Sequence, residues 1–198
     1  QNLNYGIFCY AWDEPGESLD HREKIPYIKK ECDSYQNIYD AYKNFNLINI
    51  RTEKYKNFID NLPKKHKNIY NSQNYHKGTI NCLPQIYTLS KCYELFLPHK
   101  NEYDLIFRCR FDSLFVHPLV AYPLKNIFKS NILFNINFGR AYYPKRIYDI
   151  FFGGSNESMS FLLNIWDKFP ELVNNEFDNK QDKRDACRIF YLGAKLKN

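Results

Sequence analysis

The stretch from Tyr103 to Asp112 reads YDLIFRCRFD and joins a short apolar run to two arginines and an aspartate. The apolar run predicts a β-strand from Leu105 to Arg110, and successive side chains of a strand point to opposite faces. One face holds Arg108, Arg110 and Asp112, and the other holds Phe107, Cys109 and Phe111. We expect the second face to lie against the core, and the first to present its charges at the carboxyl end of the strand.

Strands and helices are expected to alternate around this stretch. The pattern predicts further strands at Tyr5–Trp12, Leu47–Ile50, Asn131–Asn135 and Ile150–Phe152. It predicts helices at Tyr35–Phe45, Pro84–Phe96, the segment after Ser155, and Asp182–Lys195. Such alternation indicates one α/β domain over residues 1–198, with a mixed, mainly parallel sheet flanked by helices.

Local signals place the ends of two of these helices. Pro84 suits a first helical turn, where its missing N–H costs nothing, and Pro98 stops the same helix. Gly153 and Gly154 are typical of a tight turn at a strand end, and Ser155 is a good N-cap for the next helix. That helix is expected to bury Met159, Leu162, Leu163 and Trp166.

Composition limits the classes of protein that fit. Net charge is +6, a mild excess that favours phosphate-bearing ligands, an anionic membrane face or nucleic acid. The densest basic patch, Lys64–Lys67, is interpreted as a solvated loop. The six cysteines form no C-x-x-C pair, so a zinc site is not expected. Cys9 and Cys109 lie in strand-like runs, which favours buried, reduced thiols and a cytosolic protein.

The sequence was also searched for membrane-spanning and secretion segments and for its N-terminal start. No segment approaches the roughly 20 apolar residues of a membrane span, and no signal peptide is visible. The chain begins at Gln1 and opens close to a strand. We therefore expect part of the N-terminal region to be missing.

The charged face of YDLIFRCRFD can be interpreted in two ways. Ligands of open α/β sheets bind outside the carboxyl ends of the strands, and arginine forks recognise phosphate. A carboxylate there could hold a divalent cation that bridges two phosphates, which suits a nucleoside diphosphate. The alternative is a structural ion pair between Arg110 and Asp112, with Arg108 bonding to a carbonyl. Spacing alone slightly favours the ion pair.

Two more segments carry candidate residues. Asp149 begins the run that leads into Gly153 and Gly154, where glycines allow close backbone approach and a helix N-terminus attracts anions. Asp13 follows the first predicted strand and could face the same cleft. Taken alone, the first segment is an ordinary strand–turn–helix corner, and Asp13 is a residue that begins a turn.

Three segments in this order resemble a group of bacterial glycosyltransferases. They are AWDEP (residues 11–15), YDLIFRCRFD (103–112) and YDIFFGGSNESM (148–159). The group belongs to capsule, O-antigen and lipooligosaccharide gene clusters, and has a GT-A-like, Rossmann-like fold with an R-x-R-x-D strand. The resemblance covers most of the chain, from Tyr5 to about Trp166.

The resemblance implies roles for the candidate residues. Asp112 would lie near the donor diphosphate and bind a divalent cation, Mn²⁺ or Mg²⁺. Asp149 would contact the acceptor or act as general base, and Asp13 is a second candidate for the base. The implied donor-binding set is Arg108, Arg110, Asp112, Gly153 and Gly154.

The implied activity is transfer of a sugar from a nucleotide sugar to a glycan or lipid-linked glycan acceptor. It implies a cytoplasmic enzyme, with peripheral inner-membrane association as an option and no nucleic-acid partner. Two other classes stay open: a metal-dependent nucleotidyl- or phosphotransferase that uses Asp112, and a non-enzymatic module that binds nucleic acid or glycan. Nucleic-acid binding needs surface aromatics interleaved with basic residues, whereas the aromatics here fall largely on faces expected to be buried.

Overall fold

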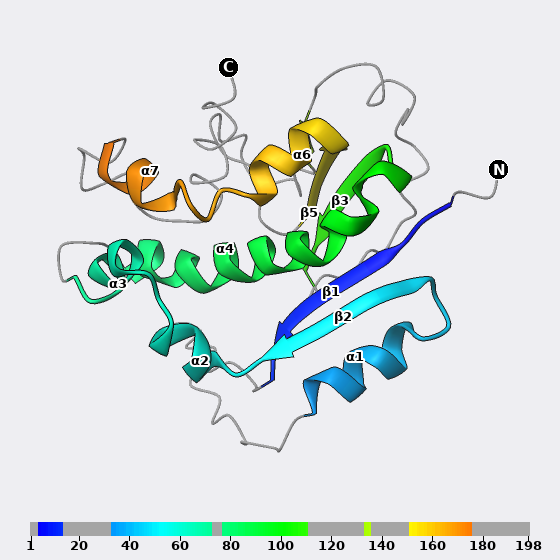
Figure 1. The fold of residues 1–198 in the computed structure, drawn as a ribbon, viewed down its shortest axis with the longest axis horizontal. Helices are drawn as coiled ribbons and strands as arrows, with labels where there is room; N and C mark the ends of the chain where they lie inside the picture. The colour runs from blue at the N-terminus through cyan, green and yellow to red at the C-terminus, as the bar shows by residue number, and fades with distance from the viewer. Residues whose placement is uncertain (1–3, 14–32, 73–76, 111–132, 136–150, 176–198) are drawn as a thin grey trace, which may run out of the picture. The chain divides into compact units, whose positions relative to one another are not determined.

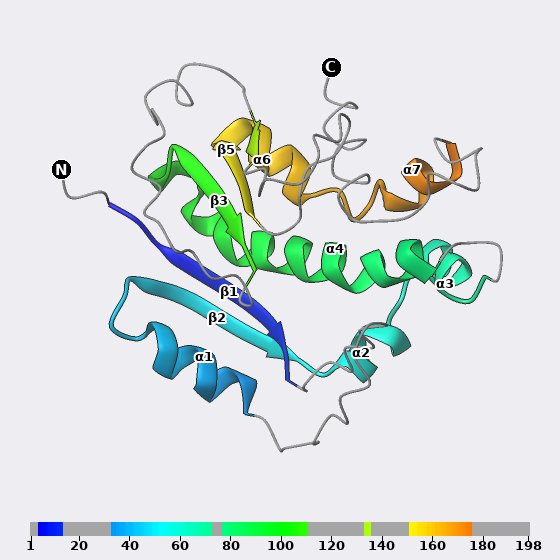
Figure 2. The same ribbon diagram turned by 180° about the vertical axis from the view of Figure 1, so that it is seen from behind.

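The computed structural model describes residues 4–13, 33–72, 77–110, 133–135 and 151–175. The chain divides into two compact units, Gln1–Pro63 and Lys64–Asn198. Each unit contains strands and helices (Figures 1 and 2). The α/β composition expected from the sequence is therefore confirmed, whereas the single domain and the GT-A-like arrangement stay predictions.

The first unit is built on a parallel pair of strands. Strand β1 (Ile7–Trp12) pairs with β2 (Leu47–Glu53), and helix α1 (Ser34–Tyr42) lies between them in the chain and packs beside β2 (Figure 1). The α1 helix begins after Asp33, whose carboxylate accepts a hydrogen bond from the backbone N–H of Gln36 at 2.9 Å. This order of strand, helix and parallel strand confirms the three elements predicted here, and β2 extends past the expected end at Ile50.

Aromatic side chains fill the core of the first unit near the end of β1. The Trp12 ring packs against Tyr55 and Phe58 of helix α2 (Tyr55–Asp60), with ring centroids 5.1 and 5.4 Å apart. Phe58 is 1% exposed, and Cys9 of β1 is buried as well. Burial of large aromatic rings stabilises the folded unit, because it removes apolar surface from water.

The second unit contains an antiparallel sheet. Its strands are β3 (Leu105–Cys109), β5 (Phe151–Ser155) and β4 (Leu133–Asn135), and their order in the sheet is β3-β5-β4. Both pairings are antiparallel. The expectation of mainly parallel strands is thus met by β1 and β2, and is wrong for the pairings described in the second unit.

Helix α4 (Lys77–Phe96) is the long element of the second unit. It buries Leu83, Ile86, Leu89, Tyr93 and Phe96 along one side. Helices α3 (Lys64–Tyr70) and α6 (Asn156–Leu163) pack against α4, and α7 (Phe169–Asn175) packs against α3 (Figures 1 and 2). The 3-10 helix η1 (Leu97–Glu102) follows α4 directly.

The predicted start of α4 at Pro84 is wrong, because the helix begins at Lys77 and contains Pro84. Proline lacks the N–H that would bond to the carbonyl of Ile80, and an interior proline costs a helix about 3 kcal/mol. Leu83 and Ile86 are both fully buried on either side of Pro84. Tertiary packing therefore keeps the helix continuous where local propensity would end it.

Two more local predictions are corrected. The basic patch Lys64–Lys67 is not a loop but the first turn of α3, where His66 is buried. Gly153 and Gly154 do not form a turn, because both lie within β5.

The Ser155 prediction is confirmed: Ser155 caps α6, and its hydroxyl accepts a hydrogen bond from the backbone N–H of Ser158 at 3.3 Å. The predicted buried residues Met159, Leu162 and Leu163 are buried. Trp166, however, follows the end of α6 and is half-buried.

Among the described helices, none is both long and apolar enough to cross a membrane. The predicted helix Asp182–Lys195 lies outside the described residues.

Candidate functional site

Asp13 stands immediately after β1, at the carboxyl end of the parallel pair. Its backbone N–H donates a hydrogen bond to the carbonyl oxygen of Glu53 at 2.8 Å, and its side chain is half-buried. Trp12 pairs with Glu53 in the last rung of the sheet. The strand end expected from the sequence is therefore present, and the backbone holds Asp13 at that edge.

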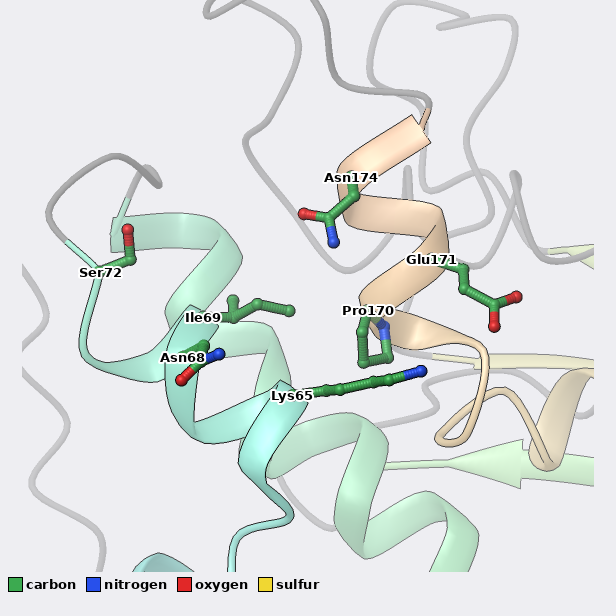
Figure 3. Close-up of a pocket in the computed structure, with 7 residues that line it drawn as sticks. All are labelled: Lys65, Asn68, Ile69, Ser72, Pro170, Glu171 and Asn174. Atoms are coloured by element: carbon green, nitrogen blue, oxygen red, sulfur yellow. The ribbon is translucent and has the colours of Figure 1, made fainter.

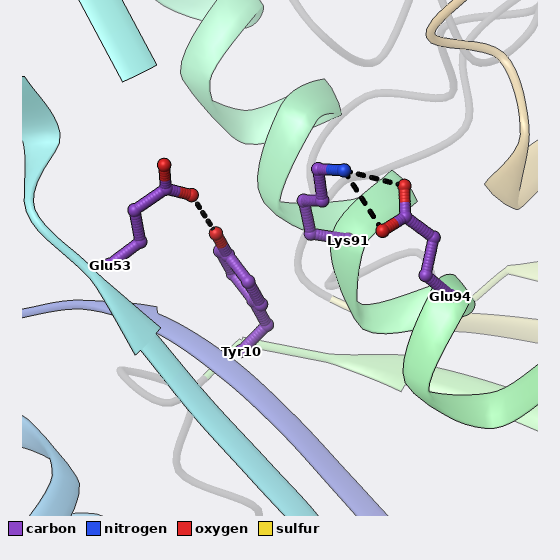
Figure 4. A network of polar contacts seen from close by, with 4 residues as sticks. All are labelled: Tyr10, Glu53, Lys91 and Glu94. Atoms are coloured by element: carbon purple, nitrogen blue, oxygen red, sulfur yellow. Dashed lines mark hydrogen bonds and ion pairs between the residues drawn. The ribbon is translucent and has the colours of Figure 1, made fainter. Parts of the chain in front are cut away.

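Glu53 brings a second carboxylate to the same edge. The hydroxyl of Tyr10, a buried residue of β1, donates a hydrogen bond to Glu53 Oε2 (Figure 4). Neighbouring parallel strands run in the same direction, so their carboxyl ends lie at the same edge of the sheet. The parallel pairing of β1 and β2 therefore places both Asp13 and Glu53 at this edge. Sequence reasoning missed Glu53, although an acidic residue at the end of LINIRTE, the residues of β2, was a usable signal.

In the second unit, Arg108 is held by the sheet. It pairs with Phe152 across β3 and β5, and its guanidinium carbon lies 5.7 Å from the centroid of the Phe152 ring. The side chain is half-buried and its Nη1 atom is buried. A guanidinium over an aromatic face keeps a favourable environment while it is partly desolvated.

Arg110 follows β3 directly and is half-buried. Strand alternation places it on the same side as Arg108, as predicted. Asp112 lies outside the described residues, so the ion pair between Arg110 and Asp112 stays a prediction, as does the metal-binding role of Asp112.

The expected core-facing side of β3 is corrected. Phe107 is 40% exposed and Cys109 is exposed, whereas Ile106 and Arg108 on the other side are half-buried. Phe107 stacks on Phe151 at 5.9 Å between ring centroids. Alternation shows which residues share a face, but the neighbouring elements decide which face is covered.

Gly153 has a packing reason to be glycine. It stands opposite Phe107 in the antiparallel register, and an added Cβ would lie 2.4 Å from Phe107 Cδ1 and 2.8 Å from the Ile106 carbonyl oxygen. The glycine therefore leaves room for the side chain and backbone of β3 to lie close to β5. Gly154 pairs with Ile106 and Leu133 in the middle strand of the sheet. Donor binding by the two glycines stays a prediction.

Asn156 fixes the point at which the chain enters β3. Its side-chain amide donates hydrogen bonds to the carbonyl oxygens of Lys100 at 2.5 Å and Tyr103 at 2.9 Å. Its backbone N–H donates to the carbonyl oxygen of Asp104 at 2.9 Å. Ser160 Oγ donates to Asn156 Oδ1 at 3.0 Å, which orients the amide. The first residue of α6 therefore anchors the strand that carries Arg108.

His66 is a second residue that sequence reasoning missed. It is 4% exposed, its ring stacks on Trp166 with centroids 3.9 Å apart, and its Nε2 lies 3.0 Å from the Trp166 carbonyl oxygen. A carbonyl only accepts, so Nε2 carries the proton and Nδ1 does not. Burial lowers the pKa of His66, and the Trp166 carbonyl opposes that change. The histidine is thus a neutral packing residue between α3 and the turn before α7.

The other polar and ionisable groups that the structure describes were compared with the requirements of a metal centre. Among the described residues there is no cluster of three or more histidine, cysteine, aspartate or glutamate side chains that could hold a metal ion. On α4, Lys91 donates to both carboxylate oxygens of Glu94 at 2.7 and 2.9 Å, one turn of the helix apart (Figure 4). Burial raises the pKa of the Cys9 thiol to about 11, so this cysteine stays protonated at neutral pH.

The predicted site residues fall in three groups. Asp13 belongs to the first unit, and Arg108, Arg110, Gly153 and Gly154 belong to the second, where the sheet brings Arg108 next to β5. Asp112 and Asp149 lie outside the described residues. Comparison of the chain with protein-family models, curated proteins and solved structures found no match.

Proposed function

We propose that this protein is a glycosyltransferase that moves a sugar from a nucleotide sugar to a glycan or lipid-linked glycan acceptor, in the synthesis of a surface polysaccharide or glycoconjugate. The observation that carries the proposal is the pair of half-buried arginines at the carboxyl end of β3. Arg108 lies over the Phe152 ring, and Arg110 follows the strand directly.

The chemistry of glycosyl transfer explains why such a pair matters. As the bond between the sugar and the nucleotide breaks, negative charge develops on the departing diphosphate. Fixed cations aimed at that charge lower the barrier, and they act more strongly when they are partly withdrawn from water. Guanidinium forks also bind phosphate oxygens two at a time, which orients the leaving group.

The acceptor side of the reaction is assigned to carboxylates. An inverting enzyme needs a base that removes the proton of the acceptor hydroxyl. Asp149 is the first candidate, and Asp13 is the second. The half-buried position of Asp13 and its backbone bond to Glu53 support a fixed carboxylate at that strand end. Asp112 is the proposed ligand for a divalent cation, Mn²⁺ or Mg²⁺.

The proposed setting is the cytoplasm, with peripheral association at the inner membrane where a lipid-linked acceptor is used. The net charge of +6 supports anionic substrates and an anionic membrane surface. Nucleic acid is not among the proposed partners.

A thermal-shift screen of nucleoside diphosphates and nucleotide sugars, with and without Mn²⁺ or Mg²⁺, tests the proposal. A ligand at a hundred times its Kd stabilises the folded state by about 2.7 kcal/mol. We expect one nucleotide to raise the Tm, and Arg110→Ala to lose this rise while Arg110→Lys keeps part of it. Arg51→Ala, at an exposed position of β2 outside the proposed site, is the control.

Product analysis with labelled nucleotide sugars then separates the enzyme classes. Release of the nucleoside diphosphate together with a glycosylated acceptor supports glycosyl transfer. Transfer of the nucleotidyl or phosphoryl group to the acceptor would show a different reaction and refute the proposal. A screen in which no nucleotide raises the Tm would also refute it.

A further inference from the structure

A pocket of about 460 Å³ lies between helices α3 and α7 of the second unit (Figure 3). Its α3 side is formed by Lys65, Asn68 and Ile69, with Ser72 just beyond the helix, and its α7 side by Pro170, Glu171 and Asn174. The volume falls in the range of about 300–1,000 Å³ that is typical of small-molecule sites. Of the predicted donor-binding residues that the structure describes, Arg108, Arg110, Gly153 and Gly154, none lines the pocket.

The lining combines an apolar base with polar groups. Ile69 and Pro170 are buried and face each other across the pocket (Figure 3). Two amides, Asn68 and Asn174, and the hydroxyl of Ser72 stand around them. Amides and hydroxyls both donate and accept hydrogen bonds, so this set matches a ligand that is rich in hydroxyl groups and has an apolar C–H face.

Lys65 gives the pocket its charge. Its side chain extends across the pocket below Pro170 (Figure 3), and it forms no ion pair with any other residue that the structure describes. The opposite charge, Glu171, pairs with Lys168 at 3.6 Å, so it is partly neutralised. Lys64 and Lys67 are exposed on the same helix. The local balance of charge favours an anion.

We propose that this pocket binds an anionic monosaccharide unit, a sugar ring that bears one carboxylate or one phosphate. Lys65 contacts the anionic group, the amides of Asn68 and Asn174 bind ring hydroxyls, and Ile69 and Pro170 pack against the C–H face. A lysine is a flexible point charge without the fixed geometry of an arginine fork, so it can pair with either a carboxylate or a phosphate. If the pocket anchors an acidic sugar of the acceptor, that role rests on the proposed function, whereas the binding itself does not.

Isothermal titration of the full chain with three monosaccharides tests the inference. The ligands are glucuronate, glucose 6-phosphate and uncharged glucose. We expect both anions to bind at least about tenfold more tightly than glucose, and the tighter one identifies the anionic group. Inorganic phosphate is the fourth ligand, and it should bind more weakly than glucose 6-phosphate because it makes none of the ring contacts.

Matched variants locate the site. Lys65→Gln is expected to weaken binding of both anions about tenfold and to leave glucose unchanged. Lys67→Gln removes an equal charge from an exposed position of the same helix, but Lys67 does not line the pocket, so affinity should stay the same. Asn68→Ala should weaken the binding of all three sugars. Circular dichroism checks that each variant is folded.

Three results would overturn the inference. They are no binding of either anion, an equal loss in Lys65→Gln and Lys67→Gln, and equal affinity for inorganic phosphate and glucose 6-phosphate. Arg110→Ala keeps these outcomes separate from those of the proposed function. It should leave sugar-acid binding intact while it removes the Tm rise given by the nucleotide.

Discussion

The carboxyl ends of β1 and β3 hold their candidate residues in different ways. At β1, the main chain fixes Asp13 through its N–H bond to the Glu53 carbonyl, and the residue is half-buried. At β3, a side-chain contact holds the candidate residue, because the Arg108 guanidinium lies over the Phe152 ring in the neighbouring strand. The first arrangement depends on the backbone of a parallel pair, and the second on side-chain packing in an antiparallel sheet. Substitutions that loosen one should therefore spare the other.

The largest effect is expected from Phe58→Ala in the first unit. Phe58 is 1% exposed and packs against Trp12, the residue before Asp13. Loss of a buried phenylalanine costs about 3–5 kcal/mol of unfolding free energy. Chemical denaturation followed by Trp fluorescence measures the change.

The matched control is Phe161→Ala, at an exposed phenylalanine of α6. We expect it to change stability by less than about 0.5 kcal/mol. Equal losses in the two variants would show that the aromatic cluster does not hold the end of β1.

The next largest loss of stability is expected from Gly153→Ala, in the second unit. The new Cβ would lie 2.4 Å from Phe107 Cδ1, and overpacking of this kind costs about 1–3 kcal/mol. Thermal unfolding measures the loss. Phe107→Leu in the same chain should recover part of it, because it removes the ring that the Cβ meets. The Ile106 carbonyl, 2.8 Å from the same Cβ, limits the recovery. Additive losses in the double variant would rule out this contact as the cause.

Asn156→Ala should cost about 1–2 kcal/mol. The carbonyl oxygens of Lys100 and Tyr103 lose their bonds to the amide, and a part-buried acceptor without its partner carries a desolvation penalty. Amide hydrogen exchange should rise most in β3, next to the lost bonds. Asn164→Ala, at the exposed C-cap of α6, is the control and should leave β3 exchange unchanged. A uniform rise over both units would contradict a local role.

The smallest effect concerns pH and His66. Burial lowers the pKa of His66 below 6.5, Lys65 lowers it further, and the Trp166 carbonyl and Asp167 oppose the change. The folded protein thus binds fewer protons than the unfolded chain. The stabilisation is complete above pH 6.5 and declines as the pH falls below 6.5 toward the folded-state pKa.

We expect the Tm of the wild-type protein to fall between pH 7 and pH 5 more steeply than that of His66→Gln. Glutamine keeps an N–H donor for the Trp166 carbonyl but does not titrate in this range. Differential scanning calorimetry in steps of pH compares the two slopes. Parallel slopes would show that His66 is not the titrating group.

Local signals in the sequence predicted several elements correctly. The apolar runs of β1, β2 and β3 and the capping serine Ser155 depend on neighbours in the chain, and the structure contains all of them. Features that depend on distant segments were missed. Gly153 is explained by Phe107, which is far away in sequence, and Pro84 is tolerated because buried residues flank it.

The candidate site was predictable only in part. The shared face of Arg108 and Arg110 follows from strand alternation, but the exposure of Phe107 depends on which face the rest of the unit covers. His66 was assigned to a solvated patch because its neighbours are lysines, whereas its ring partners are Trp166, which lies 100 residues later in the sequence, and Phe169. No spacing rule links such residues before the fold is known.

The hydrogen bonds of Asn156 also set the register between β3 and β5. Ser155, the residue before it, pairs with Leu105, and every later rung between β3 and β5 follows from that first one. A slip of one residue would send each side chain of β3 to the opposite face. Asn156 ties Asp104 to the start of α6, and Arg108 meets Phe152 because both lie four residues from this bonded pair, Asp104 and Asn156.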